Sequence, residues 1–189
     1  NLSPFSFFNA FSANPPILIF SPARRVRGNT VKHTLENVLD NKEVVISIVT
    51  AEMAQQVSLS SCDFEKGVNE FEKAGFTPIK SEIIKPFCVK ESPVNFECKV
   101  NQIISLGEEG GAGNLVICEI LKIHINEDIL DSEKNSAIAF ASSSDSGRGG
   151  RFSTTDIVFL ADLKIVNKLS VTEASMVLKS GFAKASIPR

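Results

Sequence analysis

The residues of this sequence that are best suited to chemistry form a basic cluster after a short apolar run. Arg24, Arg25 and Arg27 follow residues 17–20, Ile-Leu-Ile-Phe, and Ser21 stands at the junction. Guanidinium groups and hydroxyls supply several hydrogen-bond donors to phosphate oxygens at once. The cluster therefore indicates a phosphate site, although arginine-rich loops are also common as solvated turns, and charge alone leaves both interpretations open.

A second group of polar and aromatic residues lies upstream of that apolar run. It consists of Ser6, Phe7, Phe8 and Asn9, in a sequence that contains 14 Phe but no Trp or Tyr. In an extended segment, neighbouring side chains point to opposite faces, so Phe7 and Phe8 do not both face inward. One of these two rings is expected to be available to a ligand or a partner, while most other Phe side chains are expected to form the core.

The cysteines and histidines indicate neither a metal site nor a disulfide framework. Cys62, Cys88, Cys98 and Cys118 are far apart, without a CxxC spacing, and the chain has two histidines. Zinc sites and disulfide-rich scaffolds need closer or denser spacing. We therefore expect reduced thiols, with Cys98 and Cys118 packed in the core. His124 could donate a proton, but a histidine between two isoleucines on a strand is more often structural.

Length and composition limit the class of protein. With 189 residues and 43% apolar content, the chain is long enough for one domain with a core, or for one domain with an appendage. A net charge of -2 argues against a protein that binds nucleic acid through phosphate neutralisation. The apolar runs are too short to span a bilayer. No basic segment followed by an apolar core opens the sequence, so we expect no signal peptide and a cytoplasmic location.

The elements that would position these residues follow from periodicity. Residue 29 or 30 opens a run of apolar residues at helical intervals that ends at residues 40–41, Asp-Asn. Lys32 and Thr34 would then lie in the first turns of a helix, next to free backbone N–H groups and the positive end of the helix dipole. An anion is expected to bind at this helix start.

The rest of the pattern is mainly typical of β-structure with a few peripheral helices. The predicted elements are strands at residues 17–20, 44–49, 94–101 and 114–126, and short helices at residues 50–57 and 64–74. The second helix would end at Gly75. Alternation over residues 94–101 predicts one buried face and one wet face. The Gly-rich residues 107–113 would form the hairpin connection to the last strand.

Several segments of this chain resemble a known family. They are residues 1–12, NLSPFSFFNAFS; 14–16, NPP; 32–37, KHTLEN; 67–71, GVNEF; and 74–78, AGFTP. In order and spacing these segments resemble the flavin reductase-like family of FMN-binding split barrels, which includes the flavoredoxins. The similarity runs to about residue 131.

The resemblance implies a fold that is mainly β with peripheral helices, an FMN-binding split β-barrel with an antiparallel Greek key. It implies a homodimer with FMN bound near the subunit interface. The phosphate of FMN would contact Ser21, Arg25, Lys32 and Thr34. Its isoalloxazine ring would contact the segment formed by Ser6, Phe7, Phe8 and Asn9, in which Ser6 and Asn9 would offer hydrogen bonds to the polar edge of the ring.

The resemblance also divides the chain into a split-barrel core at residues 1–131 and a divergent or permuted segment at residues 132–189. Family members ordinarily have a helix and a first strand before the segment equivalent to residue 1. In a colinear interpretation, residues 149–152, GGRF, are a degenerate family motif. In a permuted interpretation, residues 137–142, AIAFAS, replace the first strand. A strand-wide gap in a barrel leaves backbone groups unpaired, which favours replacement from the C-terminal segment.

Three functions are compatible with this resemblance. The first is a flavin reductase that transfers hydride from NADH or NADPH to FMN, in which the flavin does the chemistry and no catalytic residues of the chain are needed. The second is a flavoredoxin-type electron carrier that acts with a redox protein partner. The third is a split barrel whose flavin site has decayed. No dinucleotide fingerprint distinguishes NADH from NADPH, because residues 107–113 lack the strand-turn-helix context.

Overall fold

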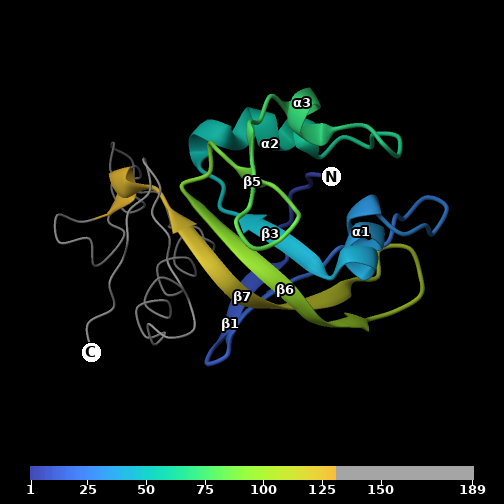
Figure 1. Cartoon of the computed structure of the whole chain (residues 1–189). Helices are drawn as coiled ribbons and strands as arrows, with labels where there is room; N and C mark the ends of the chain where they lie inside the picture. Colours follow the sequence, from blue (N-terminus) through green and yellow to red (C-terminus); the bar gives the residue numbers. More distant parts are fainter. Residues whose placement is uncertain (131–189) are drawn as a thin grey trace, which may run out of the picture.

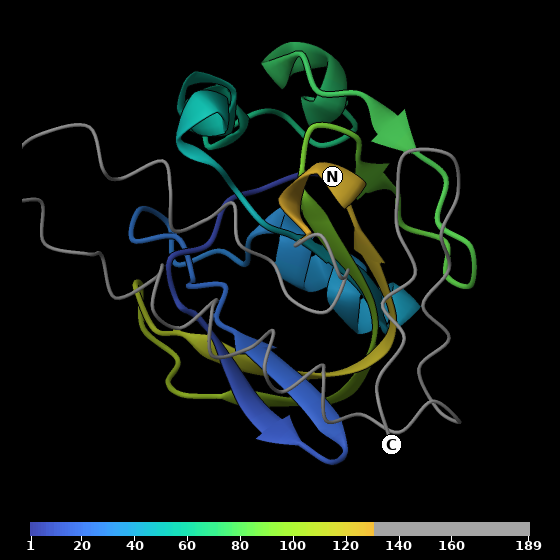
Figure 2. The same ribbon diagram turned by 90° about the vertical axis from the view of Figure 1, so that its left-hand side faces the viewer.

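A computed structural model describes residues 1–130 of the chain. They form a five-stranded antiparallel sheet in the order β1-β2-β7-β6-β3 and a two-stranded sheet, β4-β5 (Figure 1). The strands are β1 (Phe8–Ala13), β2 (Pro16–Phe20), β3 (Glu43–Ser47), β4 (Pro78–Ile79), β5 (Cys88–Val89), β6 (Val94–Ser105) and β7 (Asn114–Ile125). The large sheet is strongly curved (Figure 2), and its edge strands β1 and β3 do not pair with each other. Within the described residues, it is an open barrel.

Two expectations about the C-terminal segment are not addressed by residues 1–130. The division at residue 131 and both interpretations of residues 132–189 lie outside the described residues. No helix among residues 1–130 is long and apolar enough to cross a membrane.

The β6-β7 hairpin is the centre of the large sheet and was predicted from the sequence. Each strand has 12 residues. The Gly-rich connection between them packs against the arginine-rich bend after β2. The Arg24 N–H donates to the carbonyl of Ala112 at 2.8 Å, and the Gly111 N–H donates to the carbonyl of Arg24 at 3.1 Å. The hairpin tip therefore helps to hold the bend in place.

Helix α1 (His33–Asn41) starts three or four residues later than predicted. Gly28 and Asn29 have φ values of 73° and 48°, in the left-handed region, which a right-handed helix does not continue through. Lys32 is extended, with φ -74° and ψ 147°, and occupies the N-cap position. Val38 on the inner face of α1 is buried in the main core, as the helical spacing predicted.

The remaining helices lie together over one end of the large sheet (Figures 1 and 2). They are η1 (Ala51–Met53), α2 (Ala54–Ser60) and α3 (Glu70–Ala74), and a further short turn, η2 (Glu127–Ile129), follows β7. The predicted helix over residues 64–74 is shortened to α3, because Asn69 accepts a hydrogen bond from the Phe71 N–H at 3.2 Å and caps the helix there. Gly75 ends α3 with φ 74°, as predicted.

The main core fills the concave side of the large sheet. Its buried residues are Leu18, Phe20, Val38, Val94, Phe96, Cys98, Val100, Val116, Cys118, Ile120, Ile123 and Ile125. Cys98 and Cys118 have 0% exposure. The prediction that these two thiols pack in the core is confirmed.

The prediction of a wet face on β6 is wrong for the first half of the strand. Asn95 is 1% exposed and Glu97 is 0% exposed, although both point away from the main core. The segment at residues 80–89, which includes β5, covers them. Only beyond Cys98 does the outer face become exposed, at Lys99 and Asn101. Alternation gives the faces of a strand, but a distant segment decides whether the polar face meets water.

Candidate functional site

A large hollow of about 1330 Å³ opens between the N-terminal segment, α1 and β3. Four of the residues predicted to bind a cofactor line it: Ser6, Phe8, Asn9 and Thr34. Ser6 and Asn9 are exposed at its edge, and Phe8 is half-buried against the main core. The hollow therefore combines an aromatic wall with polar groups that face solvent.

A second, much smaller hollow of about 60 Å³ adjoins the first. Arg25, Lys32 and Thr34 line it, together with Ser3 and Ser61. Thr34 and Ser3 line both hollows. The basic groups thus lie next to the aromatic hollow and not on the opposite side of the molecule.

Helix α1 presents its N-terminus to both hollows. The Leu35 and Glu36 N–H groups donate to the Lys32 carbonyl, at 3.0 and 3.2 Å. Among residues 1–130, the backbone N–H groups of His33 and Thr34 have no hydrogen-bond acceptor. Free N–H groups at a helix start, beside a lysine, favour an anion.

Arg25 has a structural task that the sequence did not reveal. Its Nη1 group donates to the carbonyl of Val31, and its Nη2 lies 3.2 Å from Oδ1 of Asp63. These contacts join the bend after β2 to the start of α1 and to the segment after α2. Nε also donates to Oδ1 of Asp63, at 3.3 Å, so three nitrogens of the guanidinium group are engaged within the protein. Arg25 therefore chiefly shapes the small hollow.

The size of the large hollow reflects the open side of the sheet. All of residues 43–49 line it, although neighbouring residues of a strand point to opposite faces. The hydrogen-bonding edge of β3 therefore faces the hollow, and Phe8 and Asn9 of β1 face it from the other side. At about 1330 Å³ it exceeds the roughly 300–1,000 Å³ typical of ligand pockets. A ligand would occupy part of this space.

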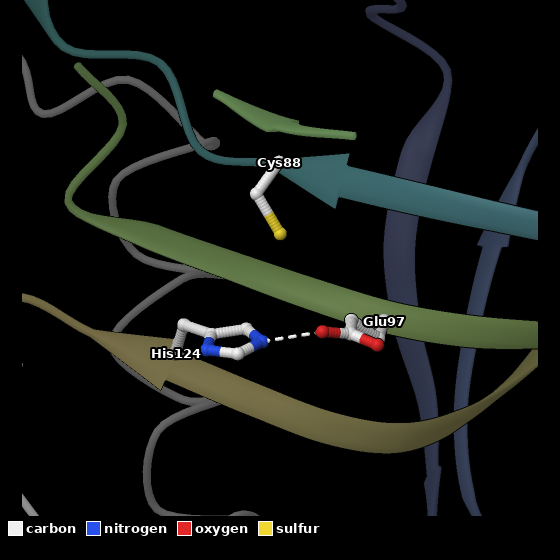
Figure 3. A group of neighbouring side chains, drawn as sticks. All are labelled: Cys88, Glu97 and His124. Carbon is white, nitrogen blue, oxygen red and sulfur yellow. Dashed lines mark hydrogen bonds and ion pairs between the residues drawn. The ribbon is translucent and has the colours of Figure 1, made fainter. Parts of the chain in front are cut away.

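A buried polar cluster supports one wall of the large hollow. The Glu97 carboxylate lies 2.6 Å from Nε2 of His124 (Figure 3) and accepts hydrogen bonds from the backbone N–H groups of Glu82 and Ile83 at 2.8 and 2.9 Å. Burial acts to raise the pKa of the Glu97 carboxyl. The hydrogen bonds from these N–H groups and from His124 outweigh burial and lower the pKa below its ordinary value.

The same cluster has the composition of a cation site but not its chemistry. Ligand atoms of Cys88, Glu97 and His124 all lie within 4.8 Å of one another (Figure 3). However, both oxygens of Glu97 already accept hydrogen bonds, and Oε2 accepts a second one from the Ile84 N–H at 3.3 Å. Burial raises the pKa of the Cys88 thiol, which favours the protonated form that metals do not bind. The cluster is therefore a hydrogen-bonded anchor.

Comparison with known proteins decides the family. A protein-family sequence model described as "Flavin reductase like domain" matches residues 1–144. The chain belongs to the flavin reductase-like family. An uncharacterized protein of Aquifex aeolicus is 38% identical over 135 residues, 71% of this chain and 66% of that protein. An uncharacterized protein of Halalkalibacterium halodurans is 32% identical over 132 residues, 69% of this chain and 63% of that protein. The chain thus spans slightly less than two thirds of these relatives.

Solved structures agree with this membership. Nitrilotriacetate monooxygenase component B from Bacillus cereus has a TM-score of 0.64 and 30% identity, over 69% of this chain and 64% of that chain. A Shewanella frigidimarina protein with a split barrel domain has a TM-score of 0.63 and 26% identity, over 75% and 67% of the two chains. Flavoredoxin of Desulfovibrio vulgaris shares the fold, with a TM-score of 0.57 at 16% identity, over 70% and 66%. The predicted split-barrel fold is confirmed.

Two of the expected cofactor contacts of this flavin reductase-like chain lie outside both hollows. Phe7 is 70% exposed and points away from the core, because its neighbour Phe8 points inward. Ser21 lies against the β6-β7 hairpin, where a Cβ atom added to Gly113 would come within 2.5 Å of its hydroxyl oxygen. Neither side chain faces the space that Ser6, Asn9 and Thr34 share.

Other residues line the large hollow that the sequence did not indicate. Among them are Lys85, Phe87 and Val89, from the segment that covers Asn95 and Glu97. This segment is mostly irregular, with the two-residue strand β5 as its main regular element. It therefore lacks the periodicity from which a sequence reveals its buried and exposed faces.

Proposed function

We propose that this protein binds FMN across the two adjoining hollows, with the phosphate in the small one and the isoalloxazine ring in the large one. The observation that carries the proposal is the placement of the predicted groups: Thr34 lines both hollows, with Lys32 on one side and Phe8 on the other. Lys32 and the backbone N–H groups at the start of α1 would bind the phosphate. The Thr34 hydroxyl, which donates to Oδ1 of Asn1 at 2.8 Å, would join them by turning its single donor toward the phosphate. Arg25 would act mainly by holding their geometry.

The ring would be oriented by the polar and aromatic residues at the edge of the large hollow. Phe8 offers an apolar surface, and the side chains of Ser6 and Asn9 offer hydrogen-bond donors and acceptors to the polar edge of the ring. Phe7 and Ser21 have no direct role in this arrangement.

We propose that the protein is an NAD(P)H:flavin oxidoreductase. Bound FMN would accept a hydride from NADH or NADPH and supply the redox chemistry. The chain would then need to bind and orient the flavin without an acid-base pair of its own. Membership in the flavin reductase-like family supports this activity.

We also propose a homodimer. Two aromatic side chains near the β1 edge, Phe7 and Phe11, are 70% and 73% exposed. Large apolar groups exposed together are typical of protein interfaces. Light scattering of the purified protein tests this proposal: twice the chain mass supports it, and Phe11→Ser should then shift the mass toward that of one chain. Independently of the oligomeric state, we propose a cytoplasmic location, because all four thiols are free in the structure.

Titration of the purified protein with FMN, followed by flavin fluorescence and absorption, tests the cofactor. Saturable quenching at about one FMN per chain is expected, and an unchanged spectrum would leave a decayed flavin site as the explanation. The loaded protein is then mixed with NADH or NADPH. Flavin bleaching supports the reductase. If only an artificial donor such as dithionite reduces the flavin, the electron carrier with a redox protein partner replaces it.

A further inference from the structure

The segment at residues 80–89 forms one wall of the large hollow without a regular fold of its own. Lys85 and Phe87 of this segment line the hollow and are exposed to it. A segment with few regular backbone hydrogen bonds needs other contacts to hold one conformation. Most of these contacts come from β6, and Glu43 of β3 and Lys122 of β7 add one each.

Glu97 binds the first half of the segment through its carboxylate. Oε1 accepts a hydrogen bond from the Glu82 N–H at 2.8 Å, and Oε2 accepts from the Ile83 and Ile84 N–H groups at 2.9 and 3.3 Å. Three successive backbone donors on one carboxylate define the path of the chain through residues 82–84. Because Glu97 is 0% exposed, water does not replace these bonds if they are lost.

Further contacts continue this anchoring toward the hollow. Asn95 accepts a hydrogen bond from the Val89 N–H at 3.0 Å and donates to the Val89 carbonyl at 3.1 Å. The Lys85 N–H donates to Oε2 of Glu43 on β3 at 3.0 Å. Residues 82–89 are thereby tied at both ends to the large sheet, and the turn that carries Lys85 and Phe87 lies between these ties.

We propose that Glu97 is a positioning residue for the flavin site. It acts through the backbone of residues 82–84, which sets the place of Lys85 and Phe87 on the wall of the large hollow. This inference rests on the proposed flavin function, because it assigns Phe87 and Lys85 to the wall against which the flavin binds.

The test compares FMN affinity in Glu97→Gln with three other variants. Gln keeps the shape of the side chain but replaces one acceptor oxygen by an NH₂ group, which faces a backbone donor. Val100→Ala is the control, because Val100 is a buried core residue of the same strand that does not line the hollow. Phe87→Ala removes the wall itself, and the fourth variant combines Glu97→Gln with Phe87→Ala.

We expect Glu97→Gln and Phe87→Ala each to weaken FMN binding by about 5- to 30-fold, and Val100→Ala to change it by less than about twofold. The loss of affinity in the double variant should be smaller than the product of the two single losses, because both changes act on one wall and only Lys85 is left for Glu97 to position. Amide hydrogen exchange at residues 82–84 should accelerate in Glu97→Gln and not in Val100→Ala.

Three results would overturn the inference: unchanged affinity in Glu97→Gln, effects that multiply in the double variant, or equal weakening by Val100→Ala. If Glu97→Gln does not fold, unchanged affinity in both Phe87→Ala and Lys85→Ala would overturn it instead. Failure of the proposed function is distinct, since the wild-type protein would then bind no FMN, whatever the variants do.

Discussion

The replacement Asn95→Asp makes a sharp test of the anchoring of β5, because it changes one atom of a buried side chain. Oδ1 of Asn95 accepts hydrogen bonds from the Val89 N–H at 3.0 Å and from the Ser47 hydroxyl at 2.6 Å, and Nδ2 donates to the Val89 carbonyl at 3.1 Å. In the aspartate, an oxygen takes the place of Nδ2 and faces that carbonyl. The aspartate can donate a hydrogen bond to the Val89 carbonyl only when its carboxyl group is protonated.

The magnitude follows from the side chain's burial. At 1% exposure, an ionised carboxylate with an oxygen opposite a carbonyl is unfavourable, so the pKa of the introduced carboxyl should be raised in the folded state. The ordinary pKa of an aspartate is about 3.9, and each tenfold change in its proton affinity on folding corresponds to about 1.4 kcal/mol. Folding in the protonated form at pH 7 therefore costs at most about 4 kcal/mol from this source, and less as the pH falls.

The stability of Asn95→Asp should change with pH in the opposite direction to that of a protein with a paired carboxylate. A raised folded-state pKa means that stability is retained below the unfolded pKa and is lost as pH rises through the folded pKa. Urea unfolding of the wild-type protein, Asn95→Asp and Asn95→Ala at several pH values between 5 and 7 measures this. The difference between Asn95→Asp and the wild type should grow by about 1.4 kcal/mol for each tenfold fall in proton concentration, while that of Asn95→Ala stays constant. A pH-independent difference for Asn95→Asp would refute the reasoning.

Three further predictions concern the bend, the anion site and the thiols. Gly110→Ala should lower the free energy of unfolding by about 1–3 kcal/mol, measured in urea, because the new Cβ would lie 2.9 Å from the Val26 carbonyl oxygen. Lys32→Ala should weaken FMN binding by about 1–3 kcal/mol in fluorescence titration, and unchanged affinity would place the phosphate elsewhere. In alkylation of the native protein followed by mass spectrometry, the exposed Cys62 should react, whereas the buried Cys118, whose pKa burial raises to about 12, should not.

Family and local structure were accessible from the sequence. The strand at residues 17–20, the β6-β7 hairpin and the Gly75 helix end were predicted correctly, because each depends on periodicity or on a residue with a special backbone preference. The start of α1 was misplaced, because Asn29 is left-handed and Arg25 holds the carbonyls of Thr30 and Val31, so that the helix begins only after the extended Lys32.

The polar side of β6 was decided by tertiary structure. The alternation that predicted a wet face at Asn95 and Glu97 is real, but residues 80–89 cover that face and turn both side chains into buried anchors. In the same way, Asp63 engages Arg25, 38 residues away, and leaves Lys32 and the start of α1 as the main candidates for an anion. A sequence pattern records local geometry, whereas burial and pairing depend on segments that only the folded chain brings together.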